Sequence, residues 1–145
     1  NAILPLGANK YSLARFSFAN QYFNPNATLS PTTIDIAESI PATGKVEIDA
    51  SSPILIKNIS INSSDYSVYL STTKSNQLLL SFYEKGTSVL KGSKYLGESV
   101  PLKAADFHQT QDGGLIILTR VTLMGSFNRI ATIKVKKEEL EASVD

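Results

Sequence analysis

Apolar and polar residues alternate along short segments of this chain, and turn-forming residues separate these segments. Val46 and Ile48, for example, alternate with Lys45, Glu47 and Asp49. A period of two residues places the apolar side chains on one face of a β-strand, so the pattern predicts half-buried strands. We expect strands at Tyr11–Phe18, Thr33–Ala37, Val46–Ile48, Ile54–Ile61, Ser67–Thr72, Gln77–Glu84, Val89–Tyr95, Ala105–Thr110, Leu115–Thr122 and Arg129–Lys136.

The expected strands are joined by segments typical of loops and turns. Asn20–Pro31 is rich in Asn, Pro and Thr and predicts a long surface connection, and Pro41–Gly44 predicts a turn. Only Lys137–Ala142 has enough good helix formers for one or two helical turns. A parallel α/β fold needs crossovers of about a dozen residues, usually helical. We therefore expect one all-β domain of antiparallel sheets over residues 1–145, with residues 1–2 as the remnant of a cleaved tag.

Composition excludes several classes of function. Fourteen basic and thirteen acidic residues give a net charge of +1, which provides no field for a nucleic-acid backbone. The chain contains no cysteine, so disulfides, thiolate zinc sites and cysteine nucleophiles are absent. No apolar run approaches the length of roughly 18 residues that a membrane-spanning helix requires. We accordingly expect no nucleic-acid partner and no membrane span.

Two parts of the chain resemble each other. Ile59–Thr72 aligns with Phe107–Thr119, and each part contains a strand, a polar turn around Asp65 or Asp112, and a second apolar strand. The period of about 50 residues, with several strands in each copy, indicates a repeated β unit. The turn at Asp112-Gly113-Gly114 predicts a tight hairpin, because glycine tolerates the positive φ angles that such turns require.

The second copy also carries a resemblance to a known family. Gln109–Thr119, with its Asp-Gly-Gly step, and Ile130–Val135 are similar to the blades of bacterial β-propeller repeat proteins, which are frequent in surface and lipoprotein chains of the Bacteroidetes. Lys94–Gly97 resembles the connection between such blades. The similarity covers about residues 54–136, although Thr119-Arg120 replaces the usual glycine and the blade tryptophan is absent. The resemblance implies repeat units at residues 54–100 and 101–136, in a bacterial cell-envelope or extracellular protein.

The number of units sets the expected architecture. A propeller ring closes with four to eight blades. We therefore expect two blade-like units packed face to face as a sandwich, or a partial propeller, and the free strand edges make a homo-oligomer an alternative.

Tyrosines supply the candidate binding residues. The chain has six Tyr, six Phe and no Trp, and several of the aromatics lie within one repeat. Aromatic side chains at exposed strand positions bind sugars or proteins well. We expect a ligand platform formed by Tyr66, Tyr69, Tyr83 and Tyr95, although aromatic residues in strands more often belong to a core.

Catalytic and metal-binding residues are not recognisable. His108 is the only histidine, and it shares a strand face with Asp106, so a His–Asp couple is geometrically feasible. No Gly-x-Ser-x-Gly or His-Glu-x-x-His pattern accompanies it. The carboxylates Asp35, Glu38, Glu47, Asp49 and Glu98 are scattered, and alternation predicts that Glu47 and Asp49 face solvent. We expect no catalytic residue, no metal and no cofactor.

These observations favour a non-catalytic binding or structural module that contacts a protein or a glycan. One alternative is a carbohydrate-active enzyme domain that uses carboxylates brought together by folding. A further alternative is an assembly domain in which exposed strands pair with a neighbouring molecule.

Overall fold

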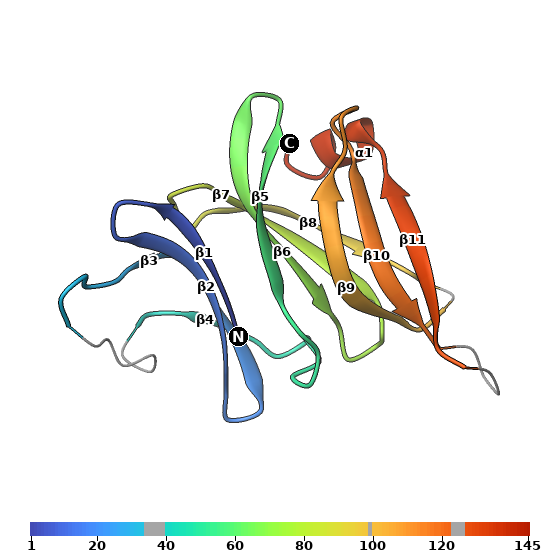
Figure 1. Cartoon of the computed structure of the whole chain (residues 1–145), viewed down its shortest axis with the longest axis horizontal. Helices are drawn as coiled ribbons and strands as arrows, with labels where there is room; N and C mark the ends of the chain where they lie inside the picture. Colours follow the sequence, from blue (N-terminus) through green and yellow to red (C-terminus); the bar gives the residue numbers. More distant parts are fainter. Residues whose placement is uncertain (34–39, 99, 123–126) are drawn as a thin grey trace.

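The computed structural model describes residues 1–33, 40–98, 100–122 and 127–145 of the chain. The described residues form three antiparallel sheets and one short helix (Figure 1). The all-β class with antiparallel sheets is therefore confirmed. None of the helical segments in these ranges has the length and apolar character needed to cross a membrane.

Each sheet is a meander, in which strands that follow one another along the chain pair side by side. The first sheet contains β1 (Ala2–Gly7), β2 (Lys10–Ser17), β3 (Asn20–Thr28) and β4 (Thr43–Lys45). The second contains β5 (Leu55–Ile61), β6 (Ser64–Thr72), β7 (Leu78–Glu84) and β8 (Leu90–Leu96). The third contains β9 (Leu102–Gln109), β10 (Leu115–Val121) and β11 (Arg129–Val135), and α1 (Lys137–Glu141) follows it.

The second sheet lies between the other two and is buried on both faces. Val68 and Leu70 of β6 belong to a core shared with the third sheet, whereas Tyr69 belongs to a core shared with the first. Successive side chains of a strand point to opposite faces, so one strand supplies both cores. Every residue of β6 from Tyr66 to Thr72 is buried as a result.

The first strands of the three sheets lie close to one another. β5 contacts β1 on one side and β9 on the other, and β6 also contacts β9. The second and third sheets also share a core that includes residues of β7, β10 and β11. The first and third sheets each keep one face that no other sheet of the described residues covers.

The first sheet corrects the expected number of sheets. Residues 54–100 and 101–136 do correspond to separate sheets, but the preceding part of the chain forms a further one. The surface connection expected at Asn20–Pro31 is wrong, because Asn20–Thr28 forms β3. Its Pro25 is tolerated because the pairing of β2 with β3 shifts register there, and the Ser12 hydroxyl donates to the Pro25 carbonyl (2.8 Å).

Two smaller expectations also change. The strand expected at Val46–Ile48 is reduced to a single bridge between Ile48 and Thr73, while Thr43–Lys45 forms β4 where a turn was expected. Val46 is exposed and Ile48 is buried, so alternation there does not reflect one strand face. Most of the strand expected at Thr33–Ala37 lies outside the described residues.

The hairpin at Asp112-Gly113-Gly114 is confirmed. Gly113 has a φ of 83°, and the Thr110 amide donates to the Gly114 carbonyl across the turn (2.9 Å). A Cβ atom at Gly114 would lie 2.5 Å from the carbonyl oxygen of Val135, so the glycine also allows β11 to approach closely. The short helix expected after Lys136 is confirmed as α1.

Candidate functional site

The four tyrosines of the expected platform do not share a surface. Tyr66, Tyr69 and Tyr83 are buried, whereas Tyr95 is about half exposed, at 49 %. The Tyr95 hydroxyl donates to the Glu47 carboxylate (2.8 Å). Tyr66, Tyr69 and Tyr83 therefore do not form an exposed platform with Tyr95.

Their burial follows from the position of the second sheet. The Tyr69 ring stacks on Phe23 of the first sheet, with 4.4 Å between ring centroids, and meets Tyr83 edge-on at 5.3 Å. The Tyr69 hydroxyl donates to the Leu13 carbonyl (3.1 Å). Burial raises the pKa of Tyr69, so this hydroxyl stays protonated and acts as a donor. Tyr66 packs into the other core, against the third sheet.

A concavity of about 360 Å³ lies on the first sheet instead. β2 and β3 run side by side there, and their register places Arg15 opposite Tyr22 and Leu13 opposite Asn24. These side chains point away from the second sheet, because the alternate residues Ala14 and Phe23 belong to the core. The residues around the concavity include Leu13, Arg15, Phe16, Tyr22, Asn24 and Ile40.

Arg15 is the one charged side chain among the described residues of this concavity. Its guanidinium carbon lies 4.9 Å from the centroid of the Tyr22 ring, in cation–π contact. Its Nε atom is buried and has no hydrogen-bond partner, and no ion pair joins Arg15 to another described residue. An unsatisfied buried donor costs about 1–3 kcal/mol. The Arg15 guanidinium therefore keeps hydrogen-bonding capacity that no other described residue uses.

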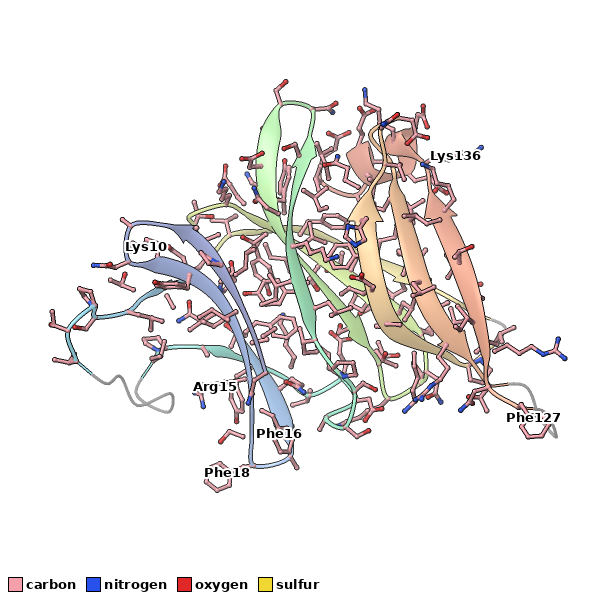
Figure 2. All side chains as sticks on the ribbon, viewed as in Figure 1. Lys10, Arg15, Phe16, Phe18, Phe127 and Lys136 are labelled. Carbon is pink, nitrogen blue, oxygen red and sulfur yellow. The ribbon has the colours of Figure 1, made fainter. Side chains whose placement is uncertain are left out.

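The walls of the concavity are fixed and mostly apolar. The Asn24 side-chain carbonyl accepts from the Asn26 amide (3.1 Å), and its NH₂ group donates to the Pro41 carbonyl, so the Asn24 amide is already engaged. Leu13 and Ile40 add apolar surface, and Phe16 is half exposed at the rim, where Figure 2 places it near Arg15. Chemically, the site can bind a planar anion such as a carboxylate that is attached to an apolar or sugar framework.

The expected couple of His108 and Asp106 forms, with a third partner that the sequence did not indicate. His108 Nε2 lies 3.1 Å from an Asp106 oxygen, and Lys57 Nζ lies 2.6 Å from the other oxygen and 3.0 Å from His108 Nε2. Lys57 is the main cause of the lowered pKa of Asp106. Since Lys57 belongs to β5 and the other two to β9, the cluster joins the second and third sheets, and the histidine is largely exposed.

The other carboxylates do not converge on a reaction centre. Asp49 accepts hydrogen bonds from Ser51 and Ser52 and forms an ion pair with Lys103. It is therefore not the freely solvated group that the alternation of residues predicted. Asp35 and Glu38 lie outside the described residues, and Glu98 is exposed. In the described part of the chain, no three His, Cys, Asp or Glu side chains are placed to hold a metal ion.

Fold and site together define an all-β domain of three stacked antiparallel sheets, with a ligand-sized concavity on an uncovered sheet face. No family model, no curated protein and no solved structure matched the chain.

Proposed function

We propose that this chain is a non-catalytic binding module that receives an anionic group of a protein or glycan in the concavity around Arg15. The observation that carries the proposal is the guanidinium stacked on Tyr22 with a buried donor and no counter-ion. Stacking holds the guanidinium in place, and its planar array of N–H donors suits bidentate binding of a carboxylate.

The stack of meander sheets supports the wider part of this proposal. Each sheet repeats the same strand order, and the first strands of the sheets lie side by side, as expected for propeller blades. On this basis we extend the proposal to a propeller-like module of a bacterial cell-envelope or secreted protein. No cofactor is needed for such a function.

Substitution of Arg15 tests the proposed site. The probes are an array of peptides with and without Asp or Glu, and an array of neutral and uronate-containing oligosaccharides. We expect acidic members of one array to bind, and Arg15→Gln to weaken that binding at least about tenfold, since hydrogen bonds to charged groups contribute about 1.5–3 kcal/mol. The class of array that responds identifies the partner as protein or glycan.

The matched control is Lys10→Gln, which removes one positive charge from an exposed residue of the same strand. Figure 2 shows Lys10 and Arg15 near opposite ends of the first sheet. Equal losses of binding affinity for the two variants would show that net charge alone explains the effect. If no acidic probe binds the wild type, or if Arg15→Gln binds unchanged, the proposal fails.

The enzymatic alternative receives less support. None of the described residues around the Arg15 concavity is Asp or Glu, so the site has no general acid or base for glycoside hydrolysis. The assembly alternative rests on a specific observation, because β8 and β11 lie at the edges of their sheets. Light scattering over a concentration series tests it, and a strict monomer would count against it.

A further inference from the structure

A second charged site lies on the third sheet, far along the chain from Arg15. The register of β9 with β10 places Lys103 directly opposite Arg120. Both point away from the core, since their neighbours Leu102 and Val121 are buried against the second sheet. Like charges opposite each other on adjacent strands destabilise a sheet. The pair therefore needs negative charge nearby.

The chain supplies only part of that charge. Asp49 lies 3.3 Å from Lys103 Nζ and is the one carboxylate in contact with it among the described residues. Arg120 is exposed and has no side-chain hydrogen bond or ion pair with any described residue. Asp49 thus pairs with Lys103 alone, and Arg120 remains available to an external anion.

A cleft of about 300 Å³ adjoins this pair. Ser51, Pro53 and Ala105 line it together with the two cations. The Ser51 hydroxyl donates to Asp49 (2.7 Å), so its proton is engaged and its oxygen offers lone pairs to the cleft. The cleft thus presents cations, a hydrogen-bond acceptor and small apolar walls.

This combination selects a class of ligand. A sulfate ion would use the cations but not the acceptor, and a nucleic-acid backbone needs a longer run of basic residues than one cross-strand pair. A sugar ring provides hydroxyl donors for Ser51 and an apolar face for Pro53 and Ala105. We infer that this cleft binds an acidic saccharide, with a carboxylate or sulfate on Arg120 and Lys103 and a ring hydroxyl donating to Ser51.

The inference goes beyond the proposed function, because it concerns a different sheet and different residues. The probes are dextran sulfate, polygalacturonate and neutral dextran, with binding to the full chain measured by calorimetry at two salt concentrations. We expect binding of at least one acidic polymer and none of neutral dextran. Preference for dextran sulfate identifies sulfate as the recognised group, and preference for polygalacturonate identifies carboxylate.

Variants separate this site from the Arg15 concavity. We expect Arg120→Gln to weaken acidic-polymer binding at least about tenfold, and Arg120→Lys to weaken it less. Lys10→Gln should leave it within about twofold, and Arg15→Gln reports separately on the Arg15 concavity. Since Arg120 is exposed, both Arg120 variants should keep the wild-type unfolding transition.

Three results would overturn the inference. The first is that no acidic polymer binds the wild type. The second is that Arg120→Gln and Lys10→Gln reduce binding equally, which would indicate attraction by net charge alone. The third is that duplex DNA of equal charge binds as tightly as the polysaccharides. A loss seen only with Arg15→Gln would instead assign the saccharide to the other site, so the two proposals fail separately.

Discussion

The substitution Tyr69→Phe removes one hydroxyl from the core between the first and second sheets and changes little else. That hydroxyl is fully buried and donates to the Leu13 carbonyl, which belongs to the other sheet. A hydrogen bond contributes about 0.5–1.5 kcal/mol net, and a buried acceptor left without its donor costs about 1–3 kcal/mol. Because Leu13 lies in a strand pairing that partly satisfies its carbonyl, we expect a loss of about 1–2 kcal/mol in the free energy of unfolding.

Urea denaturation followed by circular dichroism measures this loss. With a slope of about 1–3 kcal/mol per molar urea for a small protein, the midpoint should fall by roughly 0.3–2 M. The matched control is Tyr95→Phe, which removes an exposed hydroxyl bonded to Glu47 and should change stability by less than about 0.5 kcal/mol. Binding by the Arg15 site should be unchanged in both variants.

Equal midpoints for the two variants would refute the reasoning, since the buried contact between sheets would then contribute nothing. A second refuting result is a loss of ligand binding by Tyr69→Phe at unchanged stability, which would return Tyr69 to the role of a ligand contact. A slope that changes with the midpoint would show that the first sheet unfolds separately from the second.

Two further predictions concern the hairpin tip between β2 and β3 and the acid stability of the chain. Phe18 and Ala19 have φ angles of 47° and 65°, and Phe18 is 90 % exposed. The double substitution Phe18→Asn, Ala19→Gly should therefore relieve backbone strain and raise the free energy of unfolding by about 1–2 kcal/mol in urea titrations. An unchanged or lower free energy of unfolding would contradict this. Hydrogen bonds from Ser51 and the contact with Lys103 hold the pKa of Asp49 well below its usual range. Its contribution to stability is therefore complete above the unfolded-state pKa of about 3.9 and is lost as the pH falls below that value. As the pH falls from 6 to 2, the free energy of unfolding should decline less steeply for Asp49→Asn than for the wild type. Parallel curves would show that Asp49 does not contribute to stability in this way.

Strands were predictable from the sequence where one face of the sheet is buried and the other faces solvent, because apolar and polar residues then alternate. β10 shows this in the third sheet, since Leu115, Ile117 and Val121 are buried while Leu118 and Arg120 are exposed. β3 was missed because its polar residues and Pro25 are typical of loops, and only its pairing with β2 makes it a strand. Composition alone does not report such a pairing.

The binding residues were less predictable, for two different reasons. Alternation cannot separate Tyr69 from a surface residue, because both faces of β6 are covered and every position from Tyr66 to Thr72 is buried. Arg15 was recognisable only as a cation within a strand, since its partner Tyr22 lies in the segment that was expected to be a loop. A site formed between two strands becomes visible only when both strands are known.

The uncovered faces of the first and third sheets differ in chemistry from the faces between sheets. No charged side chain is buried among the described residues of the two cores, whereas each outer face carries an arginine without a counter-ion, Arg15 on the first sheet and Arg120 on the third. A further sheet that covered either face would remove a guanidinium from water, at a cost of several kcal/mol unless it supplied a carboxylate. Stacking by apolar contact alone therefore cannot continue at either end. Any partner that covers these faces, whether a saccharide, another protein or a second copy of the chain, has to bring negative charge to the arginine it meets.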